Sequence, residues 1–240
     1  MKYLMLIRAD GLPAPEELAV MQRELPGWSE EVDGRGVRLL GRELDLPETA
    51  ATVRVRDGQT LVTDGPFAET KEFIAGFNLL ECASSDEAIE VAAKCPVSWF
   101  QTLEIRPFLG GLRLGERASA FGRGEDGAAG PYLLIMWTDG TPAPPDGEAA
   151  MQEGTAWRQD LARRGLHVLG DALQGPGTAT TVRVRGGDTL LRKGPCTGTE
   201  QFIAGIDVVG CADRQQAIQL AAAHPFARHH AIEVRPFYRE

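Results

Sequence analysis

The sequence has no excess of positive charge and no long apolar run. Its 240 residues carry 25 Lys and Arg against 34 Asp and Glu, which gives a formal net charge of −9. Surfaces that bind nucleic acid are usually basic, so we expect no nucleic-acid partner. The apolar runs are shorter than the roughly 18 residues that a membrane span needs, and the first run is too short for a signal peptide. We therefore expect a cytoplasmic protein without a membrane partner.

Several common site motifs are also missing. The chain has no phosphate-binding G-x-x-x-x-G-K-[ST] loop, no G-x-G-x-x-G between a strand and a helix, and no G-x-S-x-G. Kinase, nucleotide-hydrolysing, dinucleotide-binding and α/β-hydrolase functions therefore have no support, and we expect no cofactor. The four cysteines form no C-x-x-C pair, and because the sequence shows no secretion signal we expect reduced thiols. The histidine spacing matches no metal motif, so we expect no metal site.

An internal repeat organises the sequence. Val53-Arg-Val-Arg56 returns 129 residues later as Val182-Arg-Val-Arg185, and Phe73-Ile-Ala-Gly76 and Arg106-Pro-Phe108 return at the same offset. We assign repeat 1 to residues 1–109 and repeat 2 to residues 131–240. The Gly-rich segment 110–130 between them has the composition of a linker, in which Leu112, Leu114 and Phe121 could dock locally.

Each repeat has the same predicted order of elements: strand, helix, strands, strand, helix, strand. The first helix is expected over Glu16–Gly36, with Pro26-Gly27 as a candidate break, and a hairpin is expected across Asp57-Gly58. This order predicts an α+β fold, with two helices on one face of an antiparallel sheet. The other face is apolar, so we expect the two repeats to pack face to face as an intrachain pseudo-dimer, in the manner of a dimeric α/β barrel. The whole chain would then be a monomer or a homodimer.

The loop Asp64-Gly-Pro-Phe-Ala-Glu-Thr-Lys71 holds the first candidate site residues. Asp64, Glu69 and Lys71 could converge at the mouth of the space between the sheets, where an acid and a base could transfer a proton. Asp64 could equally serve the turn itself. In repeat 2 these positions hold Lys193, Gly198 and Glu200, while the Gly-Pro pair remains. The three charged residues are therefore candidates for function, and the Gly-Pro pair for the scaffold.

The remaining candidates are a histidine and two arginines. His224 lies at a helix end before a proline and could act as a general base near neutral pH, or could only cap the helix. Arg54 and Arg183 occupy equivalent strand positions. If their side chains line the space between the sheets they would attract an anionic ligand, and if they face solvent they would only solubilise the sheet.

The motifs together resemble a known family. Asp64-Gly-Pro-Phe-Ala-Glu-Thr-Lys-Glu72, Cys95-Pro96 and Glu104-Ile-Arg-Pro107 are similar to the DGPF-type branch of the YCII-related domains. Repeat 2 keeps the framework but has a degenerate loop. The resemblance implies a ferredoxin-like fold that pairs as a dimeric α/β barrel. It also implies a link to transcription regulation, because genes of this family are often found with alternative sigma factors.

The resemblance does not supply a catalytic pair. The wider family has a proposed pair of a His on the first helix and an Asp before a proline, but the first helices here lack His and the pre-proline positions hold Cys95 and His224. Two hypotheses remain. One is an enzyme-like protein that binds a small, anionic molecule between its sheets, with acid/base chemistry. The other is a non-catalytic module that binds a ligand or a transcription-related partner. A buried polar pocket containing Asp64 would favour the first hypothesis, and a solvent-facing Asp64 turn together with a filled barrel interior would favour the second. A third interpretation is that the loop matters only for folding.

Overall fold

The chain forms two compact units that do not coincide with the two repeats. The computed structural model describes residues 1–67, 72–115, 117–122, 130–138, 147–197 and 201–238. Unit 1 consists of residues 1–43, 70–111 and 174–199, and unit 2 of residues 44–69, 112–173 and 200–240. Each unit therefore contains a segment from the other repeat.

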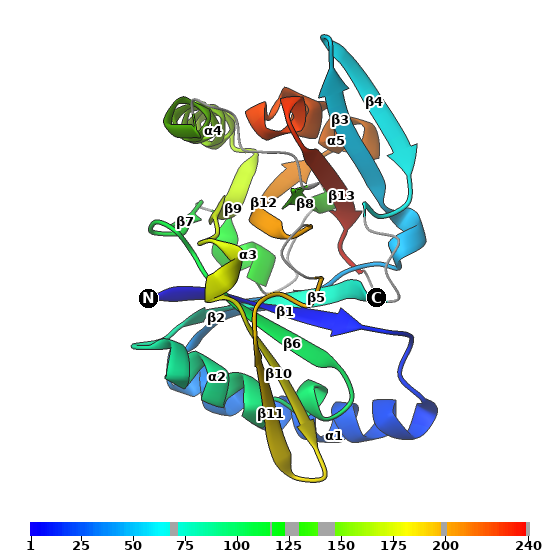
Figure 1. The fold of residues 1–240 in the computed structure, drawn as a ribbon, viewed down its shortest axis with the longest axis vertical. Coiled ribbons are helices and arrows are strands. Elements are labelled where there is room, and N and C mark those ends of the chain that lie inside the picture. The colour runs from blue at the N-terminus through cyan, green and yellow to red at the C-terminus, as the bar shows by residue number, and fades with distance from the viewer. Residues whose placement is uncertain (68–71, 116, 123–129, 139–146, 198–200, 239–240) are drawn as a thin grey trace. The chain divides into compact units, whose positions relative to one another are not determined.

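Unit 1 is a six-stranded antiparallel sheet with two helices. The strand order is β11-β10-β6-β1-β5-β2. Figure 1 shows α1 and α2 on one side of this sheet. The elements are β1 (Lys2–Ala9), α1 (Pro15–Gly34), β2 (Arg38–Glu43), β5 (Phe73–Glu81), α2 (Ser85–Lys94), the 3-10 helix η2 (Pro96–Trp99), β6 (Thr102–Pro107), the 3-10 helix η3 (Pro176–Thr178), β10 (Thr180–Arg185) and β11 (Asp188–Lys193).

Unit 2 repeats this architecture with one additional short strand, β7, and one additional short helix, α3. Its order is β4-β3-β13-β8-β12-β9-β7. The elements are the 3-10 helix η1 (Pro47–Thr49), β3 (Ala51–Arg56), β4 (Gln59–Asp64), β7 (Arg113–Leu114), α3 (Ala118–Gly122), β8 (Gly130–Trp137), α4 (Gly147–Arg163), β9 (His167–Ala172), β12 (Ile203–Cys211), α5 (Arg214–Ala223), the 3-10 helix η4 (Pro225–Arg228) and β13 (Ala231–Pro236).

The two repeats exchange a hairpin. The β3–β4 hairpin of repeat 1 joins the sheet of unit 2, where Val53 lies beside Ile232 of β13. The β10–β11 hairpin of repeat 2 joins the sheet of unit 1, where Val182 lies beside Leu103 of β6. The internal repeat in the sequence does not indicate this exchange. Both hairpins contain Thr-Val-Arg-Val-Arg, so the local pattern fits either sheet equally well.

Alternating strand residues build a core beneath the helices of each unit. In unit 1 the sheet contributes Tyr3, Met5, Leu103, Ile105 and Val182, and the helices contribute Trp28, Val32, Ala88 and Val91. The corresponding core of unit 2 includes Val53, Leu134, Val209 and Ile232 against Leu161 and Ala217. The predicted α+β architecture with two helices on one sheet face is confirmed for both repeats. The predicted face-to-face packing of the two sheets stays a prediction.

Two local expectations need correction. Helix α1 continues through Pro26 without the candidate break at Pro26-Gly27. Proline has no N–H, so Pro26 cannot donate the helical hydrogen bond to the carbonyl of Gln22. Because both residues are exposed, water can bind this carbonyl instead. The predicted linker also contains the short strand β7, which pairs with β9, and helix α3, whose Phe121 packs edge-on against Phe237 at 4.9 Å. Among the described residues, no helix has both the length and the apolar character that crossing a membrane requires.

Candidate functional site

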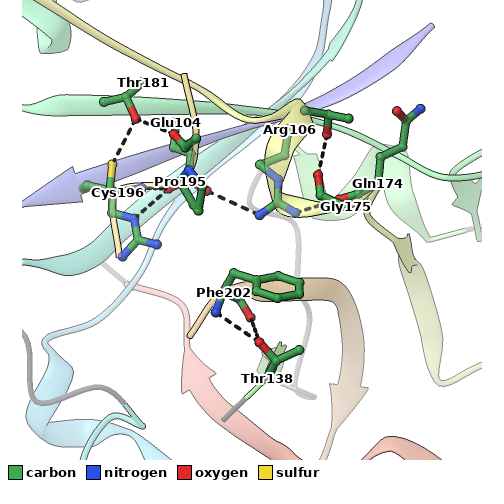
Figure 2. A network of polar contacts seen from close by, with 12 residues as sticks. Glu104, Arg106, Thr138, Gln174, Gly175, Thr181, Pro195, Cys196 and Phe202 are labelled. Atoms are coloured by element: carbon green, nitrogen blue, oxygen red, sulfur yellow. Dashed lines mark hydrogen bonds and ion pairs between the residues drawn. The ribbon is translucent and has the colours of Figure 1, made fainter. Parts of the chain in front are cut away.

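A buried glutamate in each sheet holds the Gly-Pro loop of the exchanged hairpin. In unit 1 the Cys196 backbone N–H donates to Glu104 Oε2 at 3.0 Å (Figure 2). In unit 2 the Phe67 backbone N–H donates to Glu233 Oε2 at 3.1 Å. Glu104 and Glu233 are 0% and 2% exposed. The preceding Gly194 and Gly65 have φ values of 95° and 94°, a conformation that glycine adopts without strain, which explains why both repeats keep this residue.

An arginine two residues after each glutamate fixes the other end of the exchanged segment. Arg106 Nη1 lies 3.4 Å from Glu104 Oε1, and its Nη2 donates to the Gln174 carbonyl at 2.8 Å (Figure 2). Arg235 pairs in the same way with Glu233 at 3.2 Å and donates to the Asp45 carbonyl. The Glu-x-Arg-Pro motif of the final strand therefore binds the hairpin that the other repeat supplies.

Asp64 faces solvent. Its side chain is 87% exposed, and its Oδ1 accepts a hydrogen bond from Arg214 Nη2 at 2.7 Å. A solvent-facing Asp64 favours the hypothesis of a non-catalytic module over that of an enzyme. Glu69 and Lys71, the other two candidates of this loop, lie outside the described residues.

The two candidate arginines lie on the sheet faces that point away from the helices. Val53 and Val182 belong to the helix-side cores, so the next residues, Arg54 and Arg183, point to the opposite face. Arg54 lies over the Phe67 ring at 5.2 Å, a cation–π contact. Arg183 has a buried Nε for which the described residues offer no hydrogen-bond partner. The two equivalent arginines therefore differ in their surroundings.

The strand register places Arg183 in a row with two other polar residues of unit 1. Thr102 lies opposite Arg8, and Leu103 lies opposite Val182. Continuing the second register by one residue sets Arg183 beside Thr102, so Thr102 stands between two arginines on one sheet face. Thr102 and Arg8 are 4% and 2% exposed. We call Arg8, Thr102, Arg183 and the adjoining Cys196 the arginine site.

Unit 2 fills three of the four equivalent positions with apolar residues and keeps an arginine, Arg54, at the fourth. Trp137 stands at the position of Arg8, Ala231 at that of Thr102, and Phe67 at that of Cys196. Phe67 and Trp137 stack with ring centroids 5.6 Å apart. The sequence analysis missed Arg8, Thr102 and Cys196. The signal that could have found them was the change from apolar residues in one repeat to polar residues at the same positions in the other.

The Cys196 side chain is a protonated thiol. Burial, followed by the negative charge of Glu104, raises the pKa of Cys196 to about 11. Its Sγ lies 3.6 Å from Thr181 Oγ1 (Figure 2). Because the thiolate is the nucleophilic form, Cys196 is not an activated nucleophile near neutral pH.

A second group of buried charges lies between α4 and the sheet of unit 2. Arg158 binds Asp207 through two contacts, Nε to Oδ1 at 2.7 Å and Nη2 to Oδ2 at 3.1 Å. His167 Nε2 lies 3.2 Å from the same Oδ1. Burial opposes the ionisation of Asp207, but Arg158 and the hydrogen bond with His167 outweigh it and lower the pKa of Asp207. This bidentate pair fastens the helix to β12.

His224 belongs to this group and is neutral. Burial lowers the pKa of His224 to about 4, against the weaker raising effect of Asp207. Its Nδ1 accepts the Phe226 backbone N–H at 3.1 Å, so the proton of the neutral ring is on Nε2, which lies 3.9 Å from Asp207 Oδ2. The lone pair that a general base would use is therefore occupied. The geometry supports a capping role for His224, at the start of η4 rather than at the end of α5 as expected, and not the role of a base.

These features define a tandem-repeat α+β protein whose repeats exchange a hairpin. The sequence matches the YCII-related domain family over residues 1–109 and again over residues 132–239, so the chain belongs to this family.

Two further similarities are more limited. The chain is 45% identical over 80 residues to the uncharacterized protein R00369 of Rhizobium meliloti (strain 1021), a match that covers 27% of this chain and 64% of that relative. It is also similar to the structure of a heme-binding protein from Thermus thermophilus. That likeness has a TM-score of 0.41 and 10% identity, and it covers 99% of this chain and 91% of the other. A likeness at this level carries no argument about activity.

Proposed function

We propose that the protein binds a small anionic molecule at the arginine site of unit 1. The ligand would accept hydrogen bonds from the guanidinium groups of Arg8 and Arg183 and from the hydroxyl of Thr102. Neighbouring strands are about 4.8 Å apart, so residues two strands apart are separated by roughly 10 Å at their Cα atoms. Two long side chains at this separation can converge on a carboxylate or a phosphate above the threonine.

The observation that carries this proposal is the buried Nε of Arg183. An N–H that is removed from water without an acceptor is destabilising by about 1–3 kcal/mol, and more when the group is charged. Such a group in a folded protein usually has an acceptor that is an ion or an ordered water. The described residues supply none to Arg183 Nε. A bound anion would supply it and would also offset the charge.

The charge balance at the site supports the same proposal. Arg8 Nε lies 3.4 Å from Glu104 Oε2, but Glu104 also pairs with Arg106 and accepts the Cys196 N–H. One carboxylate thus serves two guanidinium groups, and Arg183 adds a third. Glu72 also lies close enough to Cys196 to influence it. Among these described groups, three guanidinium groups stand beside two carboxylates, a balance that an anionic ligand would complement.

Binding without catalysis fits the surroundings of the candidate acids and bases. Asp64 is exposed and paired with Arg214. The Nδ1 lone pair of neutral His224 accepts the Phe226 backbone N–H. Cys196 is a protonated thiol. None of these three candidate side chains is therefore placed as an activated base or nucleophile. We therefore propose a ligand-binding module and assign it no reaction.

A thermal-shift experiment with matched variants tests the proposal. Wild type, Arg183→Met and Arg54→Met are heated with inorganic phosphate, acetate or citrate at constant ionic strength. An anion at a hundredfold excess over its Kd should stabilise the wild type by about 2.7 kcal/mol, or roughly 5–10 °C in Tm.

Arg54→Met is the control because it removes the equivalent arginine of the other repeat. It should keep the shift, and Arg183→Met should lose it. Asp64→Asn should also keep it. If every anion stabilises Arg183→Met as much as wild type, the arginine site is not the binding site.

A further inference from the structure

Strand β11 is an exposed edge strand with an unusual charge pattern. It is the terminal strand of the unit 1 sheet, and all six of its residues, Asp188-Thr-Leu-Leu-Arg-Lys193, are exposed. Leu190 and Leu191 expose 53% and 56% of their surface, one on each face of the strand. An edge strand presents unpaired backbone groups on which another strand can add. Charged residues on an edge strand usually prevent such addition. In β11 the charges have opposite signs at the two ends, with Asp188 at the start and Arg192 and Lys193 at the end.

The hairpin turn determines which backbone groups of β11 point outward. Gly186 and Gly187 have φ values of 60° and 90°, as in a two-residue type I′ turn, so Arg185 and Asp188 form the hydrogen-bonded pair that closes it. Hydrogen bonding to the neighbouring strand alternates along a β-strand. The N–H and C=O groups of Thr189, Leu191 and Lys193 therefore point away from β10.

We propose that β11 pairs antiparallel with β11 of a second copy of this chain, about a two-fold axis centred on Leu190. The axis is perpendicular to the joined sheet, so the side chains that point to one face of the sheet in one copy point to the same face in the other. Two residues that lie opposite each other must therefore have side chains on the same face. Centring the pair on Leu190 sets Thr189 opposite the second copy's Leu191, and the outward groups of these residues form hydrogen bonds. It also sets Asp188 opposite the second copy's Arg192.

Charge complementarity selects this register and this partner. The symmetric pair contains two Asp188–Arg192 contacts and brings the two Leu190 side chains together. Centring on Leu191 instead would place Arg192 opposite Leu190 and Asp188 opposite Gly194, with no ion pair. A parallel arrangement would set like charges beside each other. The sequence of β11 is thus complementary to itself only in the antiparallel register centred on Leu190.

A groove beside β11 supplies a place for an apolar side chain of the second copy. This groove has a volume of about 630 Å³, and its lining includes Ala93, Trp99, Val184 and Thr189. In the proposed register the second copy's Leu191 lies opposite Thr189 on the same face of the sheet. Its side chain therefore points toward the groove, where it would cover part of the exposed Trp99 ring.

The equivalent edge strand of unit 2 lacks this complementarity. β4, Gln59-Thr-Leu-Val-Thr-Asp64, is also fully exposed at a sheet edge. Its single charge is Asp64, which is bound by Arg214. Pairing β4 with itself in an antiparallel register gives no opposite charges. The two edges therefore provide a matched comparison inside one protein.

Sedimentation velocity over a concentration series tests the proposal with the full chain. Wild type should dimerise, and added salt should weaken the dimer. Asp188→Arg and Arg192→Asp should each weaken dimerisation roughly tenfold or more, because each reverses two contacts of the symmetric pair. The double variant Asp188→Arg/Arg192→Asp restores both contacts and should dimerise like wild type. Leu190→Arg should abolish the dimer and Leu61→Arg, its equivalent on β4, should not.

Three outcomes overturn the proposal. They are a wild type that stays monomeric at high concentration, a dimer that Leu61→Arg disrupts while Leu190→Arg does not, and a double variant as weak as the single ones. Circular dichroism on every variant separates loss of pairing from loss of folding. The rescue by the double variant is decisive in any case, since a misfolded single variant would not be restored by a second charge reversal.

Discussion

Glu104 Oε2 and the Cys196 backbone N–H, 3.0 Å apart, join the last strand of repeat 1 to the Gly-Pro loop of repeat 2. Glu233 and Phe67 make the reciprocal contact at 3.1 Å. The two motifs that resemble the family, the Gly-Pro loop and Glu-x-Arg-Pro, therefore contact each other in the structure. Each Glu-x-Arg-Pro strand binds the loop of the other repeat.

Replacing the anchoring glutamate should be strongly destabilising. Glu104→Gln removes the negative charge that Arg8 and Arg106 share, so two buried guanidinium groups lose their ion pairs with this carboxylate. Breaking a buried ion pair in this way costs about 3–5 kcal/mol. Urea denaturation followed by tryptophan fluorescence would measure the loss. Glu90→Gln, which breaks an exposed pair with Lys94 in the same unit, is the control and should leave the midpoint nearly unchanged.

The hairpin exchange predicts a specific pattern of interstrand contacts. In the exchanged arrangement Ile105 of β6 lies opposite Thr180 of repeat 2. Without exchange, the same residue would face Ala51 of its own repeat. Nuclear Overhauser effects between the backbones of residues 105 and 180 are expected in an isotope-labelled sample. Contacts between residues 105 and 51 in their place would show that each repeat keeps its own hairpin.

The order of elements in each repeat was predictable because local signals determine it. Ser84-Ser-Asp-Glu87 has the pattern of a helix start, and the Ser84 hydroxyl accepts the Glu87 N–H at the start of α2. A glycine inside a strand pattern, such as Gly76, indicates a bulge or a close backbone approach, and a Cβ at this position would lie 2.8 Å from the Arg42 carbonyl oxygen. The exchange was not predictable in this way. Which sheet a hairpin joins depends on long-range contacts, and both hairpins carry the same strand sequence.

Acid should destabilise the protein through His224. The pKa of its side chain is about 4 when folded, against an ordinary value of 6.5, because burial disfavours the charged ring. Below pH 6.5 the unfolded chain takes up a proton that the folded chain does not. Stability should therefore fall as the pH decreases from 6.5 to about 4, by about 3 kcal/mol in total. Urea midpoints measured between pH 7 and pH 4 would show the decrease.

His224→Cys is the matched variant for this pH series, because repeat 1 has Cys95 at the same position. It should flatten the dependence between pH 6.5 and 4. The lowered pKa of Asp207 acts below its ordinary value of 3.8, outside this window. A variant with the same slope as wild type would assign the acid sensitivity to another group.

The candidate site was only partly visible in the sequence. Arg183 was identified from strand alternation, because an arginine beside a core valine must point to the other face. Arg8 and Thr102 could not be identified in this way, because their proximity to Arg183 depends on the pairing of β1 and β6 with an exchanged β10. The Arg158–Asp207 pair was missed for the same reason, as its residues lie 49 positions apart. Repeat 1 has the uncharged residues Ser29 and Asn78 at the equivalent positions. This difference between the repeats was the signal in the sequence that could have indicated the pair.

The central claim is that Arg183 binds an anion that Arg54 does not, and arginine side-chain NMR tests it most directly. In a sample with labelled arginine Nε–Hε groups, the resonance that disappears in Arg183→Lys is that of Arg183. Titration with inorganic phosphate or citrate should move this resonance in a saturable manner and leave the Arg54 resonance in place. An Arg183 resonance that stays unmoved while the protein binds the anion would contradict the account.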